Sequence, residues 1–138
     1  MPEPRAIVPD SSVRGKKNAA VTAIPNRRFV KPDAANGVDA VALAAAATDV
    51  LLGVTMEAIA ANGGMGDVQT TGVAIVQAGA AVAIGARVTS DGTGRAVTWA
   101  PGAGVNHSYG GVANSAAAAA DELIEVELSG PGQVGQGA

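Results

Sequence analysis

Apolar and polar residues alternate in short runs along this chain, most clearly between residues 72 and 100. The apolar positions that share a parity there are Val73 and Ile75, then Val82, Ile84 and Val88, and finally Val97 and Trp99. Alternation with a period of two places one side of a strand in a core and the other side in solvent. The pattern therefore predicts two or three short strands within this stretch.

A turn sequence, Ser-Asp-Gly-Thr-Gly, occupies residues 90–94 between the last two of these strands. Glycine accepts the positive φ that tight reversals need, and an aspartate side chain bonds its own backbone in such turns. We therefore expect a β-hairpin here.

Further strands follow from the same alternation elsewhere. They are expected over residues 38–43, over 50–56, from Val68 onward, over 107–113 around Tyr109, and over 123–129. The alanine-rich runs at 44–47 and 116–120 have room for only one or two helical turns, which are not stable alone. Short strands separated by glycine-containing turns predict an all-β fold, a small barrel or sandwich. The acidic side of the last strand, Glu125 and Glu127, is expected to be a solvated sheet surface.

The N-terminal part of the chain differs in composition, since residues 1–33 contain five of the seven prolines. Proline fixes φ and removes a hydrogen-bond donor, so no long helix forms there. We interpret residues 1–33 as an extended basic arm, with a short strand at 19–24. Residues 34–129 are then a barrel-like body, and residues 130–138 are a Gly/Gln-rich tail without a core role.

The net charge of −3 is unevenly distributed. Residues 1–31 hold seven basic residues against two acids, whereas residues 32–138 hold two against ten. Such asymmetry indicates an interaction segment. The residues expected to contact a partner are Arg14, Lys16, Lys17, Arg27, Arg28, Phe29 and Lys31, with Phe29 as an apolar anchor. A solvated tail is the alternative; nucleic-acid binding is less favoured, because aromatic residues are nearly absent among these cations and the body is acidic.

Composition argues against an enzyme. Hydrophobic residues make up 48% of the chain but aromatic residues only 2%, so the core is built mostly from small side chains. Such a core gains from association, which favours an oligomer or lattice component. There is no cysteine, and the single histidine, His107, has no nucleophile or second metal ligand in a recognisable pattern. We expect no catalytic site, no cofactor and no metal.

Three formal motif matches do not change this expectation. Residues 130–135 match GxGxxG, but the helix that this motif needs cannot follow within the three remaining residues. Asp67 and Asp91 each lie alone in a glycine-containing turn, whereas calcium needs several converging oxygens. No apolar run approaches the roughly 20 residues of a membrane span, and no secretory signal is recognisable.

The run AGAAVAIGARVTSDGTGRAV at 78–97 is followed by Gly-Val-Ala at 111–113, an alanine-rich connection and a final LIEVELS strand at 123–129. In this order the chain resembles the capsid cement, or head decoration, proteins of tailed bacteriophages, over roughly residues 37–129.

The resemblance implies a β-rich, barrel-like structural protein on the outer surface of the phage capsid. It implies that the protein binds the major capsid protein, bridges neighbouring capsid subunits as a homotrimer, and stabilises the DNA-filled head. It implies no enzymatic activity and no small-molecule substrate. Another virion component, such as a head-fibre or tail protein, and a nucleic-acid-binding module are the alternatives.

Overall fold

The computed structural model describes residues 12–37 and 39–137, which form eleven strands and one short 3-10 helix. The strands are β1 (Ser12–Asn18), β2 (Phe29–Pro32), β3 (Ala40–Leu43), β4 (Gly53–Thr55), β5 (Gly64–Gln77), β6 (Arg87–Ser90), β7 (Ala96–Thr98), β8 (Asn106–Ser108), β9 (Gly111–Ala113), β10 (Leu123–Leu128) and β11 (Val134–Gln136). The 3-10 helix is η1 (Ala34–Asn36). The predicted all-β class is confirmed.

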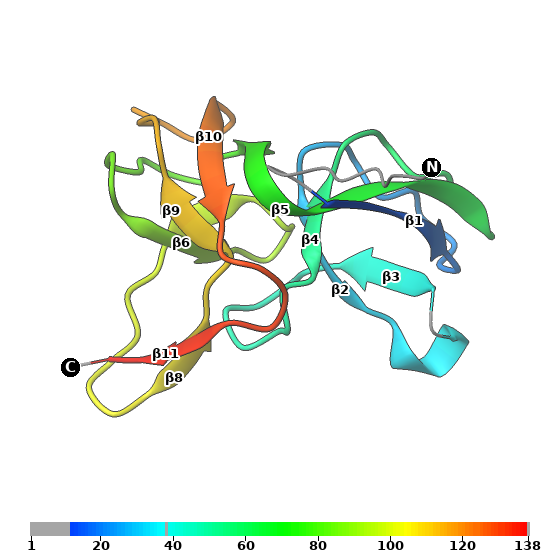
Figure 1. Ribbon diagram of the computed structural model, residues 1–138, viewed down its shortest axis with the longest axis horizontal. Coiled ribbons are helices and arrows are strands. Elements are labelled where there is room, and N and C mark those ends of the chain that lie inside the picture. Colours follow the sequence, from blue (N-terminus) through cyan, green and yellow to red (C-terminus); the bar gives the residue numbers. More distant parts are fainter. Residues whose placement is uncertain (1–11, 38, 138) are drawn as a thin grey trace, which may run out of the picture.

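Five strands close a small barrel. The neighbours run β1-β3-β2-β4-β5, and β5 pairs again with β1, so no edge is left between the first strand and the last. The β1–β3 pair is parallel and the other pairs are antiparallel. Figure 1 shows this barrel around the labels β1 to β5. The predicted barrel architecture is thus present.

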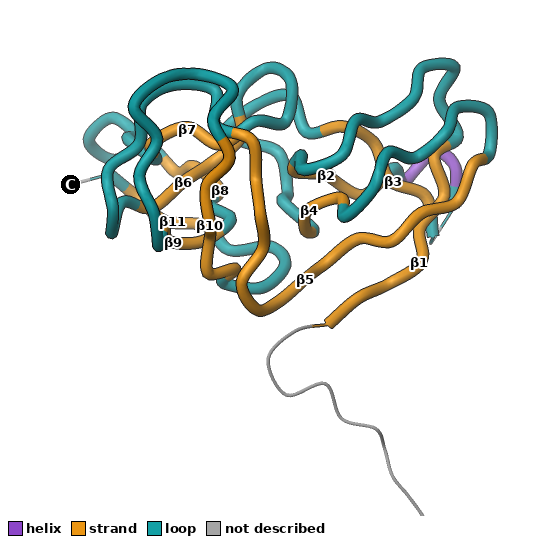
Figure 2. The backbone as a smooth tube through the Cα atoms, turned by 90° about the horizontal axis from the view of Figure 1, so that it is seen from above, coloured by secondary structure: helices purple, strands orange, loops and turns teal. Residues whose placement is uncertain are grey.

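A second ring shares β5 with the barrel. The strand has 14 residues, and its second half pairs with β10, which is followed by β9, β6 and β7. Ala78, directly after β5, forms an isolated parallel bridge with Ala96 of β7 and so links the two ends of this row. The amide of Gly79 donates to the Ala96 carbonyl at 2.7 Å. The second ring is therefore closed by one short contact, and Figure 2 shows β5 running from one unit into the other.

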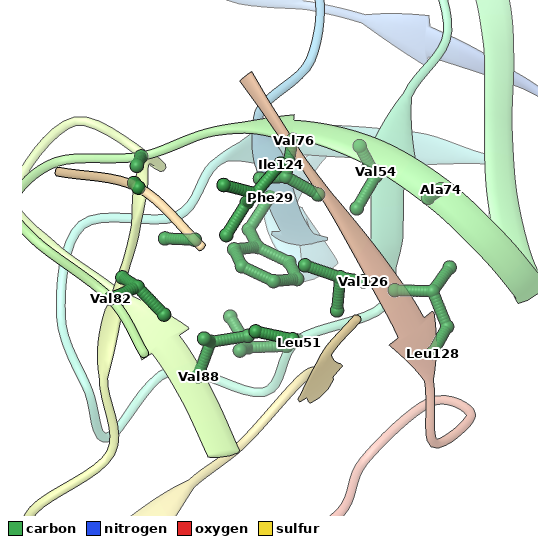
Figure 3. Packing of buried hydrophobic residues seen from close by; sticks show 14 of the residues in the cluster. Phe29, Leu51, Val54, Ala74, Val76, Val82, Val88, Ile124, Val126 and Leu128 are labelled. Atoms are coloured by element: carbon green, nitrogen blue, oxygen red, sulfur yellow. The ribbon is translucent and has the colours of Figure 1, made fainter. Parts of the chain in front are cut away.

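Each ring has its own core. The barrel encloses Ile24, Val30, Val41, Ile59 and Val68. The second ring encloses a larger cluster that includes Leu51, Val76, Val88, Ile124 and Val126, with Phe29 among them (Figure 3). Because side chains alternate along β2, Phe29 and Val30 point into different cores. One strand thereby fastens the two rings together.

The Phe29 ring requires a glycine opposite it. A Cβ at Gly110 would collide with the ring atoms of Phe29. Gly110 is buried, and its amide donates to the Val88 carbonyl at 2.8 Å. The close approach of the backbone lets one large aromatic side chain fill a core that is otherwise made of alanine and small aliphatic residues.

A two-stranded ribbon lies outside the main sheet. It pairs β11 with β8, so residues 134–136 of the Gly/Gln-rich tail form a strand that the sequence did not predict. The ribbon is held to the body by the amide of Ser108, which donates to Ala47, and by the amide of Gly132, which donates to Leu51.

The predicted strands in the hairpin region are confirmed in part. Strands β6 and β7 pair in antiparallel register across the predicted turn. The alternation at Val82 and Ile84 does not produce a strand: Val82 makes one bridge with Ala117, and Ile84 is exposed. The glycine at position 85 has φ of 86°, which turns the chain before β6.

Other expected elements are shorter than predicted. The strand expected over 50–56 is limited to the three residues of β4, and Val50 lies in the exposed approach to it. The strand expected over 19–24 is replaced by a bend, where only Ile24 bridges, to Ile59. Neither alanine-rich run forms a helix; both lie in turns.

Candidate partner-binding surface

The described part of the predicted arm is integrated into the sheet. Strand β1 pairs with β5 at seven positions, with a shift of register between Ser12 and Val13, and with β3 at two. Its cations therefore stand on the wall of the barrel: Arg14 is exposed, and Lys16 and Lys17 are partly exposed. Residues 1–11 lie outside the described residues.

The prediction that Phe29 is a contact anchor is wrong. Its side chain has 0% exposure and lies in the core of the second ring. The cationic neighbours on both sides of Phe29 suggested a surface segment, but the alternation of β2 turns this one side chain inward. Phe29 therefore contributes to stability and cannot touch a partner in the folded chain.

Arg28 is used inside the molecule. Its Nε donates to Oε1 of Gln77 at 3.0 Å, and its Nη1 donates to the carbonyl of Thr93 at 2.8 Å. These bonds tie the start of β2 to the end of β5 and to the hairpin turn. Arg27, next to it, has φ of 60° and accepts a backbone bond from the Gln77 amide. This pair of arginines shapes the junction between the rings.

Lys31 is also engaged, because its Nζ lies 3.4 Å from Oδ2 of Asp49. Partial burial raises the pKa of Asp49, but the amides of Ala45 and Ala46 and the Lys31 charge outweigh it. The pKa of Asp49 therefore lies below its usual value. Of the predicted contact cations, Lys31 alone forms an ion pair among the described residues, and Arg28 bonds neutral acceptors.

The hairpin turn is held by one carboxylate. Asp91 accepts from the amides of Thr93 and Arg95 at 2.8 and 2.9 Å and from Arg95 Nε at 3.0 Å. Partial burial raises the pKa of Asp91, but these donors outweigh it and hold the pKa below its usual value. Hydrogen bonding to Asp121, together with the charge of Asp91, raises the pKa of Arg95. Asp91 is thus the turn residue that the sequence predicts.

The acidic side of β10 is exposed, as expected. Glu125 and Glu127 alternate with the buried residues Ile124, Val126 and Leu128. On the same side of the sheet, Glu127 stands opposite Val73, which is itself exposed.

Sequence reasoning missed an aromatic cluster beside the ribbon. The rings of Trp99 and Tyr109 meet edge to face, with centroids 6.0 Å apart. The guanidinium carbon of Arg87 lies 4.7 Å from the Tyr109 centroid and 5.3 Å from the Trp99 centroid. A Cβ at Gly135 of β11 would come within 2.8 Å of the Trp99 ring. Strand β11 of the ribbon thus packs on this aromatic cluster at Gly135. No local pattern in the sequence predicts the contact.

A buried asparagine was also missed. Asn18 has 0% exposure; its Nδ2 donates to the carbonyls of Thr22 and Ile59, and its Oδ1 accepts from the Ala20 amide. The Ile59 carbonyl also accepts from the Ile24 amide at 2.9 Å, so Asn18 links the bend after β1 to the bridge between Ile24 and Ile59. The side chain therefore closes one end of the barrel.

The described residues offer little reactive chemistry. Within 12–37 and 39–137, no three His, Cys, Asp or Glu side chains gather closely enough to hold a metal ion. The backbone carbonyl of His107, in β8, accepts from Trp99 Nε1 at 3.1 Å, so His107 lies beside the aromatic cluster. No helix in the described part of the chain is long and apolar enough to cross a membrane.

The described residues thus form a closed β-barrel joined through β5 to a second ring, with charged and apolar side chains exposed on the strands. Residues 16–128 match the family described as phage cement protein. The chain therefore belongs to the phage cement protein family and has a structural, decorating role in the phage head.

One solved structure shares the fold. It is described as the head fiber gp8.5 N base in bacteriophage phi29, and it is 19% identical, with a TM-score of 0.65. The match covers 86% of this chain and 95% of that one. A search of curated proteins found no match.

Proposed function

We propose that this protein binds the outer surface of the phage capsid, contacts the major capsid protein as a homotrimer, and stabilises the DNA-filled head. The observation that carries this proposal is the family match, which runs from β1 to β10 and so includes both rings. A cement protein acts by bridging subunits, which requires contact surface and not a reactive centre.

The charge distribution supports a contact role. The cations of β1 are accessible, while residues 32–138 hold ten acids against two basic residues. Exposed charges of one sign orient an encounter, and apolar contacts supply most of the affinity of a stable interface. An acidic patch on the capsid protein or on a neighbouring copy is the surface that these cations fit. We also propose that the protein has no enzymatic activity.

The test uses purified heads that lack the protein. Adding the full chain should decorate the shell in particle images and raise the temperature at which heads release their DNA. Binding without any change in that temperature would contradict the stabilising role, and absence of binding to the shell would contradict the proposal as a whole.

The role of the N-terminal segment is tested by a deletion confined to residues 2–11. Deleting residues 1–31 is unsuitable, because it removes β1 and the buried Phe29. We expect the shorter deletion to weaken binding to heads while the unfolding midpoint stays within experimental error. Wild-type occupancy at limiting protein concentration would exclude a contribution of this segment.

The likeness to a head-fibre base favours a second candidate, a component at the foot of a head appendage. The two candidates differ in location. Particle images would show the protein either distributed over the shell or confined to the attachment points of an appendage.

A further inference from the structure

We propose that copies of this chain contact one another through the outer face of the second ring, with the acidic side of this face against the cationic side of the next copy. The face is centred on one row of residues, the outer row: Val73, Glu127, Val112, Arg87 and Trp99. This inference rests on the proposed homotrimer and names the surface that would build it.

The strand registers place the residues of the outer row side by side. Glu127 of β10 stands opposite both Val73 of β5 and Val112 of β9, and Val112 stands opposite Arg87 of β6 (Figure 1). The amide of Trp99, one residue beyond β7, donates to the Arg87 carbonyl at 2.8 Å. Residues directly opposite each other on neighbouring strands lie on the same face of a sheet. Their neighbours along the strands are buried in the second core: Ala74, Val126, Ala113 and Val88. The outer row therefore lies on the face that points away from this core.

Charges of opposite sign lie on the two sides of an apolar centre. Glu127, together with Glu125 on the same face of β10, is on one side of Val112, and Arg87 is on the other. Two strand spacings separate the backbones at Arg87 and Glu127, which is about 10 Å. Among the described residues, none of these three charged groups forms an ion pair; the salt bridges there join other residues. Each charge is therefore available to a partner.

The guanidinium of Arg87 is held on the aromatic side of the face. Its central carbon lies 4.7 Å from the centroid of the Tyr109 ring and 5.3 Å from that of Trp99, and the residue is exposed. A guanidinium that stacks on aromatic rings keeps its N–H groups for bidentate bonds to a carboxylate. Arginine, tryptophan and tyrosine are also the residues that most often dominate the binding energy of an interface. The cationic side is therefore suited to anchor a carboxylate.

The face also exposes apolar side chains on its acidic side. Val73 is 46% exposed, and Leu123, at the start of β10, is 59% exposed. Val112, at the centre of the outer row, is half-buried. An interface combines apolar contacts at its centre with polar groups at its rim. The outer face has this composition without a residue from elsewhere in the chain.

The order of acid, apolar residue and base across the row favours a second copy as the occupant. In a ring, rotation carries the same face from copy to copy, so one side of the face meets the unlike side of its neighbour. The residue nearest the rotation axis meets its own copies, and a charge there would meet a like charge. In the outer row this central residue is the uncharged Val112. A partner of one sign, by contrast, would meet a like charge at either Glu127 or Arg87.

Crosslinking at the centre of the row tests the contact directly, because the chain has no cysteine of its own. Val112→Cys, treated with a short bis-maleimide, should give covalent dimers on a denaturing gel, since each copy carries one thiol. The matched control Val21→Cys places the thiol on a side chain that is 84% exposed in the bend after β1, and it should stay largely uncrosslinked. Equal crosslinking in both variants, or none at Val112→Cys, would overturn the proposal.

Charge exchange tests the pairing. Arg87→Glu and Glu127→Arg should each raise the apparent dissociation constant of the oligomer by roughly ten-fold or more, since like charges then meet. The double variant Arg87→Glu/Glu127→Arg should recover the trimer mass in native mass spectrometry, because the two sides have exchanged sign. The control Glu57→Arg makes the same change of charge at an exposed glutamate between β4 and β5, and it should assemble as the wild type does.

Two outcomes of the charge exchange would refute the contact: wild-type assembly by Glu127→Arg, or no recovery in the double variant. Arg87→Glu also removes the contacts with the aromatic rings, so its urea midpoint is measured beside its mass. Glu127→Arg changes an exposed side chain only, and its result stands by itself if Arg87→Glu fails to fold.

Failure of this contact is distinguishable from failure of the proposed function. A wild-type chain whose native mass is that of a monomer or a dimer at every concentration would refute the arrangement, while its decoration of heads is measured separately on particles. A chain that forms the trimer through the outer row but does not bind heads would refute the function and leave the contact standing.

Discussion

The barrel and the second ring share one strand but have interiors of different kinds. The barrel encloses five fully buried apolar side chains and the hydrogen-bonded amide of Asn18. The second ring encloses fifteen buried residues, six of them alanines, packed around Phe29. The barrel is closed by continuous strand pairing, the second ring by the bridge between Ala78 and Ala96.

This difference shows two ways to stabilise a small sheet. Where the strand pairing is complete, few apolar residues and hydrogen-bonded polar side chains such as Asn18 and Thr55 suffice, because the strand pairing satisfies the backbone of the barrel. In the second ring the strand pairing is incomplete. There the ring of Phe29 fills the core, and the side-chain hydrogen bonds of Asp91 hold the hairpin turn. The substitutions below separate the two.

Replacing Phe29 should have the largest effect. Phe29→Ala leaves a cavity in the second core and should lower the free energy of unfolding by about 3–5 kcal/mol. Because β2 also lines the barrel, we expect a single transition in urea, with the midpoint shifted and the slope unchanged. Phe29→Leu, the milder control, should lose less. A loss below about 1 kcal/mol in the alanine variant would contradict the placement of Phe29.

Replacing Asn18 should act on the barrel. Asn18→Ala removes the side-chain partners of the Ala20 amide and the Thr22 carbonyl and one of the two donors to the Ile59 carbonyl, so we expect a loss of about 1–3 kcal/mol. Hydrogen exchange should accelerate first at Ala20 and around Thr22, more than in β10 of the second ring. The control Asn26→Ala changes an exposed asparagine in the same segment and should leave both measurements unchanged. If hydrogen exchange accelerated equally in both rings, Asn18 would not stabilise the barrel separately from the second ring.

Replacing Asp91 should have the smallest effect, and it should depend on pH. The pKa of Asp91 in the folded state lies below its usual value of 3.8, so the contribution of Asp91 to stability is present above that value and is lost as the pH falls through the folded-state pKa. Asp91→Asn should cost up to about 1 kcal/mol at neutral pH, since the turn is partly exposed. The variant should also lose less stability than the wild type on acidification, measured as urea midpoints from about pH 6 to about pH 2. If the urea midpoints of the wild type and of Asp91→Asn fell in parallel with pH, the stabilising role of the Asp91 carboxylate in the turn would be contradicted.

The sequence predicted the features that depend on neighbours in the chain. The alternation at 123–129 and the turn at 90–94 are local patterns, and both became the elements expected, β10 and the β6–β7 hairpin. The all-β class, a small barrel or a sandwich, followed from the spacing of such patterns, and the pairing of β1 with β5 shows that it is a barrel. Seven candidate contact residues were predicted, and the cations of β1 remain candidates because the structure leaves them accessible and without ion pairs.

The errors arose where the partner is distant in the chain. β1 pairs with β5 and places Arg14 opposite Val68, 54 residues away in the chain, so no local pattern could predict this contact. Because of this pairing, residues 12–18 of the expected arm form part of the barrel wall. The choice between core and surface for Phe29 depends on which face of β2 meets the second ring. The cationic neighbours of Phe29 led to the prediction of a surface position, whereas in the folded chain the side chain is buried.

By itself, therefore, the sequence determined the strand-forming segments, the tight hairpin, the separation of basic and acidic segments and the absence of cysteine. Only the tertiary structure decided that β5 serves two rings, that Phe29 and Val30 occupy different cores, and that β1 and β10 pair with different halves of β5. The physical reason is that alternation specifies two faces of a strand but not its neighbours. Those are selected by long-range pairing and by the shape of the space that the side chains must fill.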